Sequence, residues 1–490
     1  MDSLSDKKYL YRLGIGTLIA CAAAESLSYV SYFQPSVGAV VLLLILGVTL
    51  VASLFDVRIG LLMIMAELVI GSQGYLFSWK GISLRIGMWI IIMAVWSSRE
   101  ILAFMRKEKS FKAYHALPYS RPLIFLGASL LLAGVVGLLY QNNVNLFFLE
   151  GKRWLFALIF FPFLFSFTSR RDASRLLAVM AGAALWLCLK TFFVIYIFSH
   201  GFTPLVYDVY AWMRLDLLGE ITRLPSGFSR VFIQSQVFLI PAFFAALIIG
   251  WRKKNYWYIL CASLAMAVLI ASLSRSFWVG GACAAVGAAF TYYVHARPSL
   301  RDTAVFIGMS VAVLALALGI VFALVRFPFP KPSADLDASL LRDRATKMEA
   351  GAASRWSLLP VMAREISHSP LWGFGFGKTL TYTTSDPRIT SSTVNGEFTT
   401  SAFEWGWFDL WLKLGLIGVA AYAWLLWFML KDAWRLYTKG SMSAFVVGLS
   451  ILALAVLHFF TPYLNHPLGF TYLAVAAILL SCQYSEDMVS

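Results

Sequence analysis

Three arginines lie in short polar segments next to apolar stretches, and their side chains are suited to binding an anion. Arg223 and Arg230 flank the residues LPSGFS, and Arg275 lies in the segment ASLSRSFW. A guanidinium group is a planar fork of N–H donors that can contact two phosphate oxygens at once. Each set also has a structural alternative. Asp216 and Glu220 could simply neutralise Arg223 and Arg230, and Arg275 could extend its side chain to the membrane interface without binding a substrate. The residue types predict a site for an anionic substrate.

Two histidines lie in polar segments of the same kind. We expect His368, which precedes Pro370, to cap or order a turn, and His368 and His466 in TPYLNHP are both candidates for contact with a substrate or acceptor. The chain has no HExxH and no other metal-ligand spacing, so we expect no bound metal and no cofactor. No G-x-S-x-G turn marks a nucleophile, although a Ser-His-Asp triad stays open. The segment WGFGFGKT lacks the first glycine of a phosphate-binding loop and is interpreted as a Gly-rich turn.

The composition is that of a membrane protein. Of the 490 residues, 60% are hydrophobic and 13% are charged, and the mean hydropathy is +0.75. The apolar stretches are close to the roughly 20 residues that cross a bilayer, so we predict an all-α polytopic protein with about 14 (12–14) spans. Glu67 and Lys190 fall inside predicted spans and are candidates to pair with each other. The five cysteines fall in or beside spans and predict no disulfide. The expected spans are 12–30, 36–55, 59–76, 81–97, 122–140, 153–168, 176–198, 231–250, 256–273, 276–294, 303–325, 409–430, 443–460 and 468–482.

The net charge of +15 follows the pattern expected from membrane topology. With a cytoplasmic N-terminus, the basic loops between spans all fall on one side, as the positive-inside rule requires. The C-terminus is then cytoplasmic as well, and we exclude nucleic acid as a partner. The first apolar stretch has no small-residue cleavage site and is expected to remain as a span. The basic residues concerned are Lys7, Lys8, Arg12, Arg106, Lys107, Lys109, Lys112, Arg121, Arg170, Arg171, Arg175, Arg252, Lys253, Lys254, Arg297, Arg301, Lys431, Arg435 and Lys439.

One large polar segment, residues 327–407, interrupts the spans and is external in this topology. It separates about eleven spans in residues 1–326 from about three in residues 408–490. A single ordered loop of this size is expected to carry function. Residues 335–349 lack Gly and Pro and suit a helix, and apolar spacing predicts a second helix at 354–367. We expect this helix pair to roof a cavity at the outer membrane surface.

Four segments resemble the O-antigen ligase and Wzy-type polysaccharide polymerase superfamily. TRLPSGFSRVFIQSQ (222–236) is similar to the family's arginine-containing external segment, and LSRSFWVGGACAAVGA (273–288) is similar to its Ser-Arg segment. RWSLLPVMAREISHSPLWGFGFG (355–377) resembles its loop helix and the Pro-x-x-Gly-x-Gly turn that follows. EWGWFDLWLKLGLIG (404–418) resembles the entry to the span after the loop. The earlier spans are similar in topology only.

The resemblance implies a GT-C-like membrane transferase in the bacterial inner membrane, with its active site facing outside. The implied donor is a glycan carried on undecaprenyl diphosphate, used without a nucleotide sugar or a metal. The family's two arginines hold the diphosphate, which implies this role for Arg275 and Arg223, with Arg230 as the alternative. The implied partners are the lipid-linked glycan, the lipid bilayer and, as a candidate, a chain-length regulator.

The chain departs from the family at the catalytic base. Counting back from Gly415 and Gly418, Glu404 stands where the family has histidine, and Trp405 stands where it has asparagine. A carboxylate can act as a general base if burial raises its pKa, so we expect Glu404 to take a proton from an acceptor hydroxyl. Trp405 and Trp407 could stack on sugars or anchor at the interface. We favour a polymerase of lipid-linked repeat units. The alternatives are a ligase to lipid A-core or another acceptor, and a flippase, which would be expected to show internal repeats.

Overall fold

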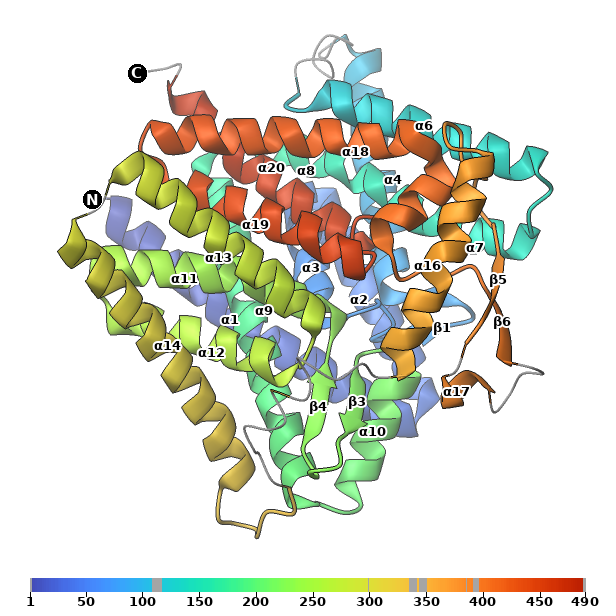
Figure 1. Cartoon of the computed structure of the whole chain (residues 1–490). Helices are drawn as coiled ribbons and strands as arrows, with labels where there is room; N and C mark the ends of the chain where they lie inside the picture. Colours follow the sequence, from blue (N-terminus) through green and yellow to red (C-terminus); the bar gives the residue numbers. More distant parts are fainter. Residues whose placement is uncertain are drawn as a thin grey trace.

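A computed structural model describes residues 2–107, 117–297, 299–334, 342, 350–384, 386–390 and 396–487. Within these residues the fold is mostly helical, with three small antiparallel hairpins (Figure 1). The hairpins pair β1 (Ser78–Trp79) with β2 (Ile82–Ser83), β3 (Glu220–Arg223) with β4 (Ser229–Phe232), and β5 (Leu380–Thr383) with β6 (Glu397–Thr400). The helices are α1 (Asp2–Phe33), α2 (Pro35–Phe55), α3 (Val57–Ile70), α4 (Leu84–Met105), α6 (Ser120–Leu139), α7 (Val144–Leu155), η1 (Phe156–Ile159), α8 (Phe160–Ser166), α9 (Arg170–His200), α10 (Leu205–Leu215), η2 (Gln234–Phe238), α11 (Leu239–Lys253), α12 (Tyr256–Ala271), α13 (Arg275–Ala296), α14 (Leu300–Arg326), α16 (Ala350–His368), α17 (Pro387–Thr390), α18 (Gly406–Thr438), α19 (Met442–Phe460) and α20 (Pro467–Asp487).

Ten helices of the described chain are long and apolar enough to cross a membrane, which indicates a multi-pass membrane protein. They include α1, α2, α4, α6, α9, α13, α14, α18 and α19, together with η2 and α11 as one segment. Two further apolar helices, α12 and α20, are shorter. The expected spans 59–76 and 153–168 fall on α3 and on the broken segment of η1 and α8, which do not reach that length. The larger count of about fourteen therefore stays a prediction.

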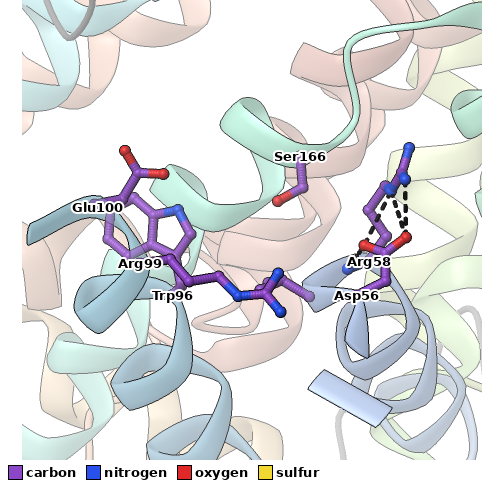
Figure 2. A pocket seen from close by; sticks show the side chains of 7 residues that line it. Asp56, Arg58, Trp96, Arg99, Glu100 and Ser166 are labelled. Carbon is purple, nitrogen blue, oxygen red and sulfur yellow. Dashed lines mark hydrogen bonds and ion pairs between the residues drawn. The ribbon is translucent and has the colours of Figure 1, made fainter. Parts of the chain in front are cut away.

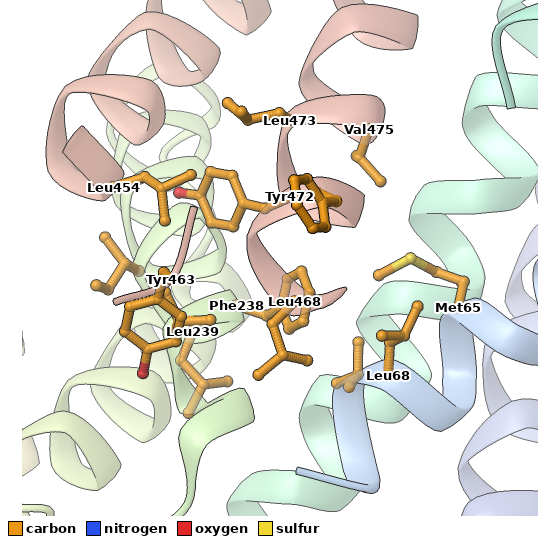
Figure 3. Close-up of a cluster of buried hydrophobic side chains, with 14 of the residues drawn as sticks. Met65, Leu68, Phe238, Leu239, Leu454, Tyr463, Leu468, Tyr472, Leu473 and Val475 are labelled. Carbon is orange, nitrogen blue, oxygen red and sulfur yellow. The ribbon is translucent and has the colours of Figure 1, made fainter. Parts of the chain in front are cut away.

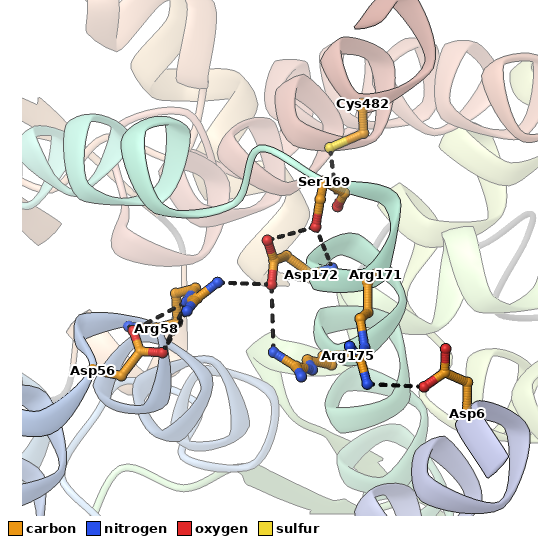
Figure 4. A network of polar contacts seen from close by, with 8 residues as sticks. All are labelled: Asp6, Asp56, Arg58, Ser169, Arg171, Asp172, Arg175 and Cys482. Carbon is orange, nitrogen blue, oxygen red and sulfur yellow. Dashed lines mark hydrogen bonds and ion pairs between the residues drawn. The ribbon is translucent and has the colours of Figure 1, made fainter. Parts of the chain in front are cut away.

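Polar contacts mark the end of the bundle that carries the N-terminus (Figure 4). Arg171 at the start of α9 pairs with Asp6 of α1 at 3.0 Å. Arg58 at the start of α3 reaches Asp172 of α9 at 3.2 Å, and Ser169 caps α9 by accepting from the Asp172 N–H. The turns α2–α3 and α8–α9 therefore lie at one end of the molecule. Figure 1 places α16, β5 and β6 at the opposite end from both termini.

The most buried part of the bundle surrounds α20. Apolar residues occur on every face of this helix, and almost all of them are buried, so neighbouring helices rather than lipid cover it. α20 packs against α8, α18, α19 and α9. Tyr472 stacks on Phe238 of η2 with ring centroids 5.9 Å apart, and Met65 and Leu68 of α3 come close from the other side (Figure 3). This core fixes the position of the turn that precedes α20.

The described part of the segment 327–407, which follows α14, is partly helical, as predicted. α16 covers the predicted helix 354–367, whereas the predicted helix 335–349 lies outside the described residues except for position 342. The Gly-rich turn follows α16, and Gly373, Gly375 and Gly377 all have positive φ (67°, 74° and 81°). A Cβ on Gly375 would lie 2.1 Å from the backbone nitrogen of Gly137 in α6. Glycine is therefore required where this turn packs against the membrane helices.

Candidate functional site

The turn between α19 and α20, residues 461–466, brings together segments that are far apart in the sequence. α19 ends because Thr461 precedes a proline, and its backbone is extended (φ −150°, ψ 121°). The Thr461 hydroxyl donates to Ser276 Oγ in α13 at 3.2 Å. The Tyr463 hydroxyl donates to the carbonyl oxygen of Gln234, just after β4, at 3.0 Å. The two arginine-bearing segments singled out from the sequence therefore meet at this turn.

Arg230 contacts the short polar segment that precedes Arg275 in the sequence. Arg230 Nε donates to the carbonyl oxygen of Ser272 at 2.7 Å, and its guanidinium carbon is 5.2 Å from the centroid of the Phe232 ring. Ser272 is buried and lies three residues before Arg275, the first residue of α13. The Arg230 guanidinium is thereby held against the backbone of the segment that leads into Arg275 at the start of α13. Such an arrangement can bind an anion with more than one phosphate.

Arg223 is separated from these two residues by the pleat of its hairpin. Thr222 is opposite Arg230, and Arg223 is opposite Ser229. Residues directly opposite each other in a β-hairpin share a face, and neighbours along a strand alternate, so Arg223 and Arg230 leave opposite faces. Within the described part of the chain, Arg223 is exposed and forms no ion pair with Asp216 or Glu220. The geometry favours Arg230, the alternative residue, as the partner of Arg275.

Glu404 lies two residues before α18 and pairs with Arg355 of α16. Both side chains are about half exposed (48% each), so the burial on which its role as a base was argued is absent. The next residue, Trp405, is buried, and its Nε1 donates to the carbonyl oxygen of Arg355 at 2.8 Å. Its ring contacts Phe459 and Phe460 at the end of α19, with centroids 5.7 and 6.0 Å away. Trp405 is therefore a packing residue rather than a free surface for a sugar.

An apolar groove of about 460 Å³ opens beside the same end of α19. Trp407 lines it, but its Nε1 donates to the carbonyl oxygen of Ala455 at 3.0 Å, so its polar edge is occupied. Val279 lines it from α13 and lies four residues after Arg275, on the same face of that helix. A cationic residue thus stands one helical turn from an apolar groove. The lining residues are Val279, Trp407, Ala455, Val456, Phe459 and Phe460.

A buried group of charges lies on the other side of the turn, and the sequence analysis missed it. Lys413 Nζ of α18 is 2.8 Å from an Asp409 carboxylate oxygen and 2.9 Å from one of Glu150 in α7. The amide of Asn465, in the turn, donates to the Asp409 carboxylate. The Glu150 carboxylate also accepts from the backbone N–H of Gly377 at 2.9 Å. The signal in the sequence was the i, i+4 pair of Asp409 and Lys413 inside an otherwise apolar helix.

The predicted pairing of Glu67 with Lys190 is wrong. Glu67 forms a buried bidentate pair with Arg85 of α4, at 2.7 and 3.1 Å. Lys190 pairs instead with Glu25 of α1 and also donates to the carbonyl oxygen of Ile70 at 3.2 Å. Glu67 therefore connects α3 to α4, and Lys190 connects α9 to α1. Each of the two charges has a partner of opposite sign.

The two candidate histidines differ in environment. His466 is partly buried, and burial, together with the positive charges of Arg85 and Arg153, holds its pKa well below the usual 6.5. Its Nδ1 accepts from the Leu468 N–H at 3.3 Å, so the neutral ring carries its proton on Nε2 and can donate it to an oxygen. His368 is exposed at the end of α16, with Nδ1 3.7 Å from a Glu365 oxygen. The turn therefore presents His466, and His368 is a surface residue.

No three His, Cys, Asp or Glu side chains of the described residues form a group that could hold a metal ion. No family model matches the chain, and no curated protein matches it.

Proposed function

We propose that the protein is a glycan polymerase that uses a polyprenyl-diphosphate-linked donor. A single arrangement carries this proposal. Arg230 and Arg275 offer two guanidinium groups near the start of α13, and the apolar groove begins one turn further along the same helix face. A ligand that fits both parts has a multiply charged anionic head and a long apolar tail. A lipid diphosphate has this chemistry, and a water-soluble nucleotide sugar does not.

In the proposed reaction, an acceptor sugar hydroxyl attacks the anomeric carbon of the donor glycan. The bond between that carbon and the diphosphate oxygen breaks, and the electron pair leaves with the polyprenyl diphosphate. Arg230 and Arg275 stabilise the negative charge that develops on the leaving oxygen. Glu404 takes the hydroxyl proton once its ion pair with Arg355 of α16 opens, because a carboxylate held by a guanidinium group is a weak base. In this proposal the neutral ring of His466 donates a hydrogen bond from Nε2 to an oxygen of the substrate.

The finer architecture is part of the same proposal. We propose about fourteen crossings in a GT-C-like fold, with α3, the η1–α8 segment, α12 and α20 as short or broken spans. The N-terminal end of the bundle faces the cytoplasm of a bacterium, and the segment 327–407 faces outside. This orientation is supported by the basic residues at that end, such as Arg106 and Arg171.

Purified protein given a lipid-linked repeat unit tests the proposal. Arg275→Ala and Arg230→Ala are expected to lower chain extension at least tenfold, because a charged hydrogen bond to phosphate contributes roughly 1.5–3 kcal/mol. Arg223→Ala, on the other face of the hairpin, should lose less. Arg214→Ala, an exposed arginine of α10, is the matched control and should extend chains normally. Normal extension in both Arg230→Ala and Arg275→Ala would contradict the proposal. Transfer to a lipid A-core acceptor alone would indicate a ligase, and lipid translocation without transfer would indicate a flippase.

A further inference from the structure

We propose that one face of the β3–β4 hairpin binds the sugar that is attached directly to the donor diphosphate, and that Glu220 and Thr222 are the residues that contact it. The ligand is a neutral hexose ring with hydroxyl groups on adjacent carbons. This inference rests on the proposed function, because it places the sugar next to a diphosphate bound by Arg230. Neither Glu220 nor Thr222 has a role in the proposed transfer step.

The hairpin has one buried face and one open face, because side chains alternate along each strand. On the open face, Glu220 and Thr222 are exposed, and Arg230 is partly buried. Thr222 is directly opposite Arg230, and Glu220 is diagonal to it. The Cβ atoms of such pairs are about 5 Å apart when directly opposite and roughly 7 Å apart on the diagonal. The buried face is formed by Ile221, Ser229 and Val231.

The open face adjoins the start of α13, where Arg275 lies (Figure 1). Arg230 Nε donates to the carbonyl oxygen of Ser272 at 2.7 Å. The ring of Phe232, on the open face opposite Glu220, contacts Phe277 of α13 with centroids 5.6 Å apart. A sugar attached to a diphosphate at Arg230 therefore comes within one ring of Glu220 and Thr222.

The side chains of Glu220 and Thr222 are available to a ligand. Neither forms a hydrogen bond or an ion pair with any residue that the structure describes, so Glu220 does not neutralise Arg230. A carboxylate beside a phosphate-binding arginine repels a bare diphosphate. It favours a ligand that also carries O–H donors, because a carboxylate accepts at both oxygens and can bind two adjacent hydroxyl groups. Sugars provide such donors.

The pocket of about 250 Å³ at the N-terminal end of the bundle differs in this respect (Figure 2). There, both carboxylate oxygens of Asp56 accept from Arg58 Nε, at 3.0 and 2.9 Å. Arg99 donates to the carbonyl oxygen of Leu54. These charged groups stabilise the turn between α2 and α3, whereas those of the hairpin face are free of such a structural role.

The test measures the binding of two synthetic lipids to the whole protein in detergent. One is a polyprenyl diphosphate without sugar, and the other is the same lipid carrying one glucose. Glu220→Gln should weaken binding of the glucosyl lipid about tenfold, because a hydrogen bond to a charged group is weakened, and Thr222→Val should weaken it about fivefold. Glu220→Gln should not weaken binding of the sugar-free lipid, because it removes a charge that repels the diphosphate. Glu397→Gln is the matched control, since Glu397 is an exposed glutamate on the β5–β6 hairpin.

Three results would overturn the sugar site: glucose that adds no affinity in the parent protein, glucosyl-lipid binding that is unchanged in both variants, or equal weakening of both lipids by Glu220→Gln. Arg230→Ala tests the proposed function separately, because it should weaken binding of both lipids at least tenfold. If Arg230→Ala leaves both unchanged, the diphosphate site is wrong, whereas a loss confined to the glucosyl lipid in Glu220→Gln still supports the sugar site. Both substituted positions are exposed, and Thr222→Val keeps the side-chain shape, so folding is expected to be retained.

Discussion

Replacing Lys413 by methionine is expected to destabilise the protein more than any other single change of charge near the turn 461–466. The ammonium group lies 2.8 and 2.9 Å from two carboxylates and 3.0 Å from the carbonyl oxygen of Ser401. The Lys413, Asp409 and Glu150 side chains are only 6%, 3% and 7% exposed. Methionine fills a similar volume but leaves two buried carboxylates without a cation. Removing one partner of a buried ion pair costs roughly 3–5 kcal/mol.

The assay is unfolding in mixed micelles, followed by circular dichroism, from which the free energy of unfolding is obtained. Lys413→Arg keeps the charge and should lose less stability. In Lys413→Met combined with Asp409→Asn, one of the two uncompensated charges is removed, so the double variant should be more stable than Lys413→Met alone. Two results would refute the reasoning: a Lys413→Met variant within about 0.5 kcal/mol of the parent, or strictly additive losses in the double variant.

Three further predictions follow from the same structure. Burial raises the pKa of Asp216, at the end of α10, from 3.8 to about 6. The folded state therefore binds a proton more tightly than the unfolded state does. The stability that this group contributes should fall as the pH rises from about 4 to 6. Asp216→Asn should remove that dependence and raise stability at pH 7, and an unchanged pH profile would contradict the assignment. Gly415→Ala should abolish folding or sharply lower expression, because Gly415 has φ 66° and an added Cβ would lie 2.1 Å from the carbonyl oxygen of Leu371. Gly440→Ala is the control, because Gly440 also has a positive φ but an added Cβ would meet no atom within 4 Å. In a cysteine-free background, an outside thiol reagent should label Ile82→Cys and leave Arg106→Cys unlabelled, and the opposite pattern would reverse the proposed orientation.

The sequence predicted the helices better than it predicted their partners. Apolar stretches identify buried or membrane helices directly, and Pro462 and Pro467 bound the turn between the last two helices. Partner choice depends on helix rotation, which hydropathy does not specify. Glu67 and Lys190 therefore each pair with a residue that the sequence did not single out, Arg85 and Glu25.

The same limit applies to the candidate site. The sequence resemblance put Arg223 ahead of Arg230, but the register of β3 and β4 places the two residues on opposite faces and favours Arg230. That register follows from the five-residue connection LPSGF, which pairs Arg223 with Ser229 and so puts Arg230 on the other face. Glu404 could not be judged without α16, because Arg355, its partner, lies 49 positions earlier in the chain. The Lys413 group needs four segments to meet, so only its i, i+4 pair was visible in the sequence.

The most direct test of the central claim is a product balance with the unmodified protein. Purified protein in lipid vesicles is given a polyprenyl-diphosphate-linked repeat unit carrying one label in the glycan and a second in the lipid. The account predicts lengthening glycan chains and the release of one polyprenyl diphosphate for each new glycosidic bond, without added nucleotide or metal. Unchanged donor after prolonged incubation, or labelled lipid that crosses the bilayer with its glycan still attached, would contradict it.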